Sequence, residues 1–219
     1  RDSLTFAAAK SVYLAGDMGE ARTKLSNYLN NFDKGYNRTE ALFYLSDCYL
    51  RDDKRESALE SMEELLSHGS NLYSERVLVV MAPMCRDMEL FEKSASAYRK
   101  LYDTAHDATK RGVASEGYVE ATLKYAYNDE LIAMAEDVEK MEYATERAKR
   151  MAILAKARVL YDRGSDEAYT IFAHLADKRT TAEGTEAYYR LVEQQYTLGK
   201  LDVAEKMIYE LGDCGSVYW

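Results

Sequence analysis

The stretch Gly16-Asp17-Met18-Gly19-Glu20-Ala21 decides the fold, because it is a tight polar turn that closes on a small residue and has relatives down the chain. We take the residue that closes each such turn as its anchor. The six anchors are Ala21, Ala58, Ser94, Met134, Ala168 and Ala204. They lie 34 to 40 residues apart, and a period in this range predicts a repeat made of two helices.

Apolar residues hold a fixed place after each anchor. Four residues after the anchors stand Leu25, Met62, Tyr98, Val138, Phe172 and Ile208, and seven after them stand Tyr28, Leu65, Leu101, Met141, Leu175 and Leu211. Positions i, i+4 and i+7 share one helix face, so the second helix of every repeat is predicted to bury a stripe. In the first repeat we expect helices over Leu4–Ala15 and Met18–Asn31, with Gly16 ending the first of them.

The first helices carry their own pattern before the anchor. Twelve residues before five of the anchors stand Ala9, Ser46, Ala82, Thr122 and Val192, and nine before them stand Val12, Tyr49, Cys85, Tyr125 and Gln195. With the glycine-aspartate elbow and the alanine and aromatic of the second helix, this pattern resembles the tetratricopeptide repeat. The resemblance covers nearly the whole chain, although the proline usual at repeat junctions is absent. It implies an all-α fold, an α-α superhelix (solenoid) of about six helical hairpins.

The same resemblance bears on the source and the compartment. The chain is most similar to the divergent repeats of bacterial cell-envelope proteins, and among them to the repeat arrays of large Bacteroidetes proteins. This favours the periplasm or the cell envelope, with the cytoplasm as the alternative.

A single solenoid is predicted over residues 1–219. Its repeats are predicted over residues 3–32, 39–69, 71–106, 108–142, 143–178 and 180–211, with 212–219 as the start of a further, truncated repeat. Pro83 falls inside a predicted first helix, where it should bend the helix. The alternative interpretation is a change in the shape of a binding groove.

Composition excludes several classes of protein. A content of 47% hydrophobic and 31% charged residues is typical of a packed domain, and a single proline argues against an all-β fold. The net charge of −9 disfavours nucleic acid as a partner, and no apolar run reaches the length of a membrane span. The three cysteines, Cys48, Cys85 and Cys214, are too few for a disulfide scaffold. We expect free thiols, the first two of them buried.

No catalytic constellation is present. The sequence has no phosphate loop, no dinucleotide fingerprint and no His-Glu-x-x-His, and His68, His106 and His174 lack the spacing of metal ligands. We therefore predict no cofactor, no metal and no enzymatic activity. A basic stretch lies at mixed helical angles and is expected to be partly solvated; its members are Arg147, Lys149, Arg150, Lys156 and Arg158.

The candidate binding surface follows from the resemblance. In a tetratricopeptide-like stack the first helices line a concave groove, which gives these candidate partner-binding residues: Lys10, Tyr13, Phe43, Asp47, Arg51, Arg86, Tyr127, Tyr189, Glu193 and Tyr196. Tyrosine and arginine are frequent anchors of protein interfaces. Each tyrosine has a second interpretation, because it can pack between repeats without meeting a ligand.

The predicted function is a non-catalytic protein–protein interaction scaffold that binds a peptide or a partner domain in this groove. One alternative is a structural spacer within a larger envelope protein. The other is an enzyme or enzyme-accessory domain, with a site between helices or outside this segment. The residues specify neither the identity of the partner nor the oligomeric state.

Overall fold

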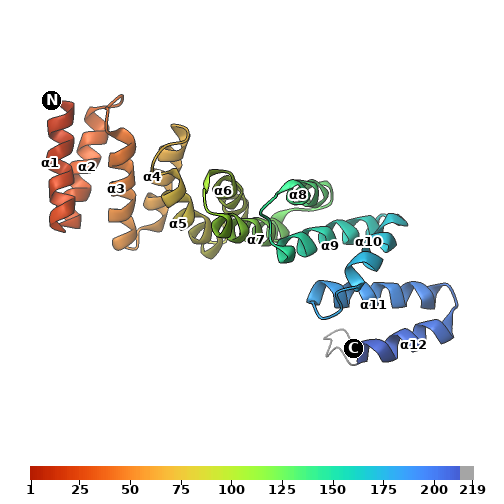
Figure 1. Ribbon diagram of the computed structural model, residues 1–219. Helices are drawn as coiled ribbons and strands as arrows, with labels where there is room; N and C mark the ends of the chain where they lie inside the picture. The colour runs from red at the N-terminus through yellow and green to blue at the C-terminus, as the bar shows by residue number, and fades with distance from the viewer. Residues whose placement is uncertain (213–219) are drawn as a thin grey trace. The chain divides into compact units, whose positions relative to one another are not determined.

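The computed structural model describes residues 1–212, and over these residues it contains twelve α-helices and no strand (Figure 1). The chain divides into two compact units, Arg1–His106 (unit 1) and Asp107–Trp219 (unit 2). The predicted start of a further repeat and Cys214 lie outside the described residues.

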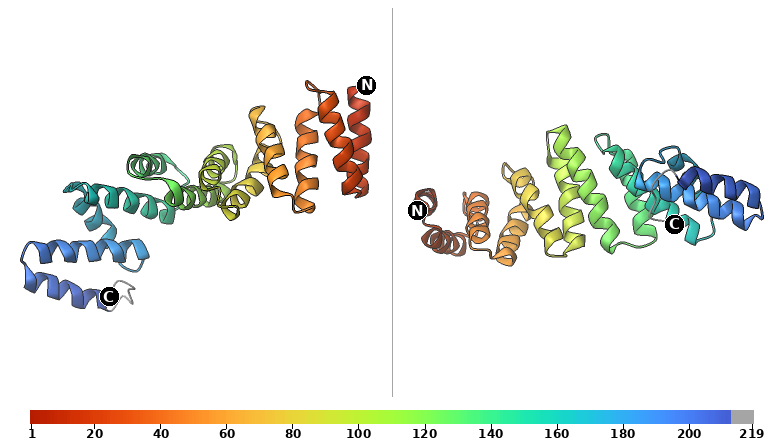
Figure 2. Two further views of the ribbon diagram at one scale, coloured as in Figure 1. Left: turned by 180° about the vertical axis from the view of Figure 1, so that it is seen from behind. Right: turned by 90° about the horizontal axis from the view of Figure 1, so that it is seen from below.

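Unit 1 consists of three helical hairpins. Its helices are α1 (Asp2–Ala15), α2 (Met18–Asn31), α3 (Arg38–Arg51), α4 (Arg55–Ser67), α5 (Ser74–Asp87) and α6 (Phe91–Thr104). Each helix packs against the next one in the chain, and α1 also touches α3 (Figure 2). The first hairpin has the predicted second helix, and its first helix starts two residues earlier than expected.

Unit 2 repeats this arrangement with less uniform helices. They are α7 (Ala108–Tyr125), α8 (Asp129–Lys140), α9 (Glu146–Asp162), α10 (Glu167–Ala176), α11 (Ala182–Thr197) and α12 (Leu201–Gly212). Both α8 and α10 pack on α9, which also touches α7 and α11. The all-α fold of tetratricopeptide-like hairpins is therefore confirmed for the described residues.

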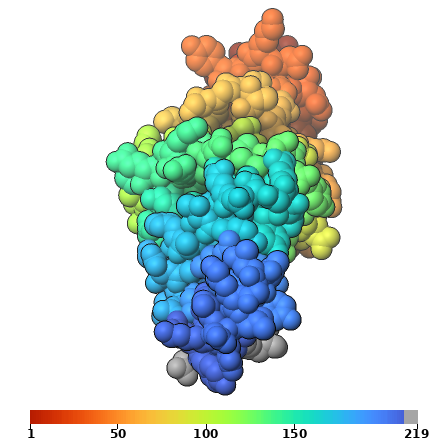
Figure 3. Space-filling view, turned by 90° about the vertical axis from the view of Figure 1, so that its right-hand side faces the viewer, coloured from red at the N-terminus to blue at the C-terminus, as the bar shows by residue number. Residues whose placement is uncertain are grey.

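The spacing of apolar residues relative to the anchors explains which side chains are buried between the helices. All six anchors are buried, as are the residues four positions after the first five of them. The sixth, Ile208, is 40% exposed, which differs from the predicted buried stripe. The reason is that α12 packs only against α11 among the described helices, so its outer face is at the surface (Figure 3, blue).

Two smaller predictions concern single side chains. Cys48 and Cys85 are buried free thiols, as expected. Pro83 lies within α5 without ending it, since the helix continues to Asp87. No helix among residues 1–212 is long and apolar enough to cross a membrane.

Every elbow contains one residue with positive φ. Glycine takes this position in the first, fifth and sixth hairpins, but Asp53, Glu89 and Asn128 take it in the others. Left-handed backbone costs a residue with a side chain about 1–2 kcal/mol, and glycine is largely free of this cost. The elbows of the second to fourth hairpins therefore store conformational strain.

We expect Glu89→Gly to raise the free energy of unfolding by about 0.5–1 kcal/mol, because φ at Glu89 is 59° and its side chain is exposed. Denaturant titration followed by circular dichroism measures the change. The matched control is Glu92→Gly, which lies in the first turn of α6 and should lose up to about 1 kcal/mol. Equal losses in both variants would contradict the assignment of strain to the elbow.

Candidate functional site

The first helices of unit 1 bring together five of the predicted binding residues. On α3, Glu40, Tyr44, Asp47 and Arg51 are spaced i, i+4, i+7 and i+11, so they lie on one face. On α1, Lys10 and Tyr13 face them. We call these six residues and Phe43 the first-helix surface.

Direct contacts join α1 to α3 across this surface. The Lys10 ammonium lies 2.7 Å from Glu40 Oε1 and 5.6 Å from the centre of the Tyr44 ring. The Tyr13 hydroxyl donates to Asp47 Oδ2 at 2.8 Å, and its ring centre lies 4.5 Å from that of Tyr44. These contacts hold both tyrosine rings in place.

Phe43 extends the surface toward α5. Its ring stacks on Tyr73, with centres 4.7 Å apart and an interplanar angle of 27°. The Arg76 guanidinium lies over the same ring at 4.8 Å, and Arg51 at the other end pairs with Asp47 at 2.8 Å. Arg51 and Arg76 remain exposed, so cationic side chains flank a row of aromatic rings.

Partial burial and these contacts shift several pKa values. Burial, together with the hydrogen bond to Asp47, raises the pKa of Tyr13 to about 12. The hydrogen bond to Glu40 raises the pKa of Lys10. Burial raises the pKa of Glu40, but the hydrogen bonds from Lys10 and Tyr44 lower it by more, so the net shift is downward. The first-helix surface therefore keeps Lys10 and Glu40 charged and Tyr13 neutral at pH 7.

We expect Tyr13→Phe to remove a phenol that titrates near pH 12. The raised pKa means that Tyr13 contributes stability fully below about pH 10 and loses this contribution as the pH rises through 12. Alkaline titration of phenolate absorbance, as a difference between wild type and variant, measures the transition. Tyr36→Phe, at an exposed tyrosine, is the control and should leave the transition near pH 12 unchanged. A Tyr13 difference curve centred near pH 10 would contradict the structure.

The other predicted binding residues do not join this group. Arg86 pairs with its neighbour Asp87, and Tyr127, 74% exposed, stands just before α8. On α11, Glu193 pairs with Arg190 at 2.8 Å, and Tyr196 is 68% exposed. Tyr189 packs partly buried against the core of unit 2.

Sequence reasoning missed four residues of this region, Glu40, Tyr44, Tyr73 and Arg76. The spacing on α3 was a usable signal for Glu40 and Tyr44, because both share a face with Asp47 and Arg51. Tyr73 stands at the start of α5, outside any helical pattern, so only the structure places it.

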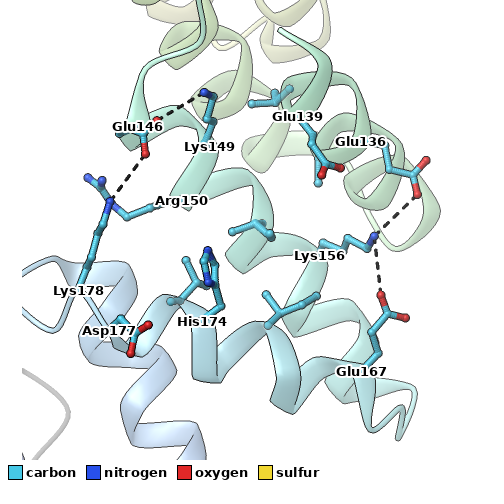
Figure 4. Close-up of a pocket in the computed structure, with 15 residues that line it drawn as sticks. Glu136, Glu139, Glu146, Lys149, Arg150, Lys156, Glu167, His174, Asp177 and Lys178 are labelled. Carbon is cyan, nitrogen blue, oxygen red and sulfur yellow. Dashed lines mark hydrogen bonds and ion pairs between the residues drawn. The ribbon is translucent and has the colours of Figure 1, made fainter. Parts of the chain in front are cut away.

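Unit 2 contains a half-open cavity of about 620 Å³ between α8, α9 and α10 (Figure 4). Its floor is α9 and its walls are α8 and α10, which pack on α9 but hardly on each other. The partly buried apolar side chains in it are Ile153 on the floor and Ile171 on one wall.

Charged side chains surround this apolar centre. At one end Glu146 faces Lys149 at 3.5 Å and Lys178 at 3.8 Å. At the other end Lys156 lies 3.9 Å from Glu136 and 4.0 Å from Glu167, and His174 lies between the two groups (Figure 4).

The predicted basic stretch is thus divided by the structure. Lys149, Arg150 and Lys156 line the cavity. Arg147 pairs outside it with Glu116 and Glu120, and Arg158 pairs with Glu186. Within residues 1–212, His, Cys, Asp and Glu form no group able to hold a metal ion.

Comparison with known proteins gives structural likeness only. No family model matches the chain, and no curated protein matches its sequence. A tetratricopeptide repeat protein from Parabacteroides merdae has a similar structure, with 17% identity and a TM-score of 0.46, over 98% of this chain and 80% of that one. Yeast Tom70 is similar with 15% identity and a TM-score of 0.41, and the match covers 96% of this chain and 40% of Tom70.

Proposed function

We propose that the chain is a non-catalytic protein-interaction scaffold that binds a peptide segment of a partner on the first-helix surface of unit 1. The observation that carries the proposal is the row formed by Tyr13, Tyr44 and Phe43, which is partly exposed and flanked by Arg51 and Arg76.

Two physical properties make this row suited to binding. Aromatic rings contribute a large apolar area at small entropic cost, since each has only two side-chain torsions. Contacts with Asp47 and Tyr73 already hold the Tyr13 and Phe43 rings, and such preorganisation lowers the entropic cost of binding. The exposed guanidinium of Arg51 can turn from Asp47 to an incoming carboxylate, because a surface ion pair is worth at most about 1 kcal/mol.

Selection from a random peptide library against the full chain tests the proposal. Peptides enriched on the wild type should lose most of their affinity for Phe43→Ala and for Arg51→Glu. The matched control for charge is Arg55→Glu, an exposed arginine at the start of α4, which should bind as the wild type does. Circular dichroism verifies that each variant is folded.

Enriched peptides that bind Phe43→Ala and Arg51→Glu unchanged would contradict this surface as the binding site. A selection that enriches no sequence at all would count against the scaffold and in favour of the structural spacer.

A further inference from the structure

We propose that the cavity between α8, α9 and α10 is a second protein-binding site, which takes an extended peptide segment with two basic side chains flanking apolar residues. This site lies within unit 2 and shares no residue with the first-helix surface. The test of this second site is therefore independent of the test of the proposed function.

The repeat register shows why this cavity is open. Unit 1 has a smaller cavity, of about 230 Å³, in the equivalent place between α4, α5 and α6. There Glu63, five residues after one anchor, and Lys93, one residue before the next, form an ion pair of 2.6 Å between the walls. In unit 2 the same two positions hold Glu139 and Glu167. Two carboxylates cannot form an ion pair with each other. A cation from another residue or from a ligand must therefore balance their charge.

Lys156 only partly replaces the cation that Lys93 provides in unit 1. It lies about 4 Å from both Glu136 and Glu167, which is beyond hydrogen-bond distance. Glu139 on α8 and Asp177 after α10 line the cavity, and their carboxylates have no hydrogen-bond or ion-pair partner among the described residues. A ligand with two cations therefore gains two new charge pairs without breaking an existing one.

The apolar centre and the dimensions favour a short extended segment. Ile153 and Ile171 give an aliphatic surface on the floor and on one wall, partly open to solvent. Lys149 and Lys156, which mark the two ends, are seven residues apart on α9, or about 10 Å along the helix. The first and fourth residues of an extended segment, three residue steps apart, span about the same distance. The volume of about 620 Å³ is within the range of small-ligand sites.

The isoleucines give this site a built-in reporter. The chain has four isoleucines, Ile132, Ile153, Ile171 and Ile208, and only the middle two line the cavity. We would label the isoleucine methyl groups of the full chain and titrate it with the capped peptide acetyl-Arg-Leu-Leu-Arg-amide, observed by NMR. The signals of Ile153 and Ile171 should shift and saturate, while those of Ile132 and Ile208 stay in place.

Two control peptides separate the charge from the apolar contribution. Acetyl-Arg-Ser-Ser-Arg-amide should bind at least about tenfold more weakly, because serine lacks the apolar surface that the leucine side chains would bury against Ile153 and Ile171. Acetyl-Glu-Leu-Leu-Glu-amide should not shift the cavity signals, because the cations that line the cavity already face carboxylates, whereas Glu139 and Asp177 would repel it. Equal binding of the serine peptide, or shifts spread over all four isoleucines, would overturn the proposal.

Substitutions of the two carboxylates Glu139 and Asp177 test their role in binding. Glu139→Gln and Asp177→Asn should each weaken binding of the leucine peptide about threefold, and together about tenfold. Glu142→Gln is the matched control, an exposed glutamate just after α8 that does not line the cavity, and it should bind as the wild type does. Glu139→Lys places opposite charges at the two wall positions, as in unit 1 but with the signs exchanged, and should abolish binding. Unchanged affinity in the double variant or in Glu139→Lys would overturn the proposal.

Discussion

Phe172→Ala should lower the free energy of unfolding by about 3–5 kcal/mol, the largest effect we expect from a single substitution in this chain. Phe172 is 0% exposed and lies in the core of unit 2. Its ring centre lies 6.2 Å from those of Tyr161 and Tyr169, with both pairs close to an edge-to-face arrangement. Alanine would leave a cavity that the packed helices α9, α10 and α11 cannot fully close.

The place of Phe172 in the repeat explains the size of this effect. It stands four residues after the anchor Ala168, at the position where the second helix faces its neighbours. The helix that carries it, α10, is the shortest described, with ten residues, and it packs on α9 and α11. A short helix has few other contacts, so its stability depends strongly on this one ring.

Denaturant titration measures the loss. The control is Tyr209→Ala, at an exposed aromatic residue of α12. It should change the free energy of unfolding by less than about 0.5 kcal/mol. Amide hydrogen exchange locates the effect. Protection should fall in α9, α10 and α11 and stay unchanged in α1 to α3, because repeats transmit stability mainly to their neighbours. A loss below about 1 kcal/mol, or an equal loss of protection in both units, would contradict this account.

The fold could be predicted because its determinants are local and periodic. The anchor interval, the stripe at i+4 and i+7, and glycines such as Gly16 are visible in sequence, and they place the elbows and the buried face of each hairpin. Glu89 was harder to recognise as the positive-φ residue of its elbow, since glutamate is not a usual choice for this backbone conformation. The exposure of Ile208 depends on what covers a helix, and periodicity does not report this.

The candidate sites could be predicted only in part. Helical spacing places Lys10 and Tyr13 on one helix and Asp47 on another, but it does not say that Tyr13 reaches Asp47 or that Lys10 reaches Glu40. Those contacts depend on how far one repeat is displaced along the next. The cavity of unit 2 was missed, although comparison of Glu63 and Lys93 with Glu139 and Glu167 would have shown the like charges.

Arg158 and Glu186 provide the second large prediction, at an ion pair between α9 and α11. Arg158 Nε donates to Glu186 Oε1 at 2.7 Å, and Nη2 donates to the other carboxylate oxygen, so the pair is bidentate. The Glu186 side chain is only 6% exposed, whereas that of Arg158 is 48% exposed. A carboxylate this deeply buried depends on its donors, because burial of a charge without them is costly.

We expect Arg158→Met to lower the free energy of unfolding by about 2 kcal/mol. This is less than the 3–5 kcal/mol of a fully buried pair, because water screens the exposed side of the guanidinium. Methionine keeps the aliphatic part of the side chain, so the loss reports the charge and its hydrogen bonds.

A double-mutant cycle with Glu186→Met separates the pair from the packing of each side chain. The double variant should recover at least about 1 kcal/mol relative to the sum of the two single losses, since it leaves no buried carboxylate without its guanidinium. The matched control is Arg163→Met, which removes an exposed arginine one turn later that pairs with exposed Asp129, and it should cost less than about 1 kcal/mol. Additive losses in the cycle would show that Arg158 contributes through packing alone, and would contradict the role of this pair in joining α9 to α11.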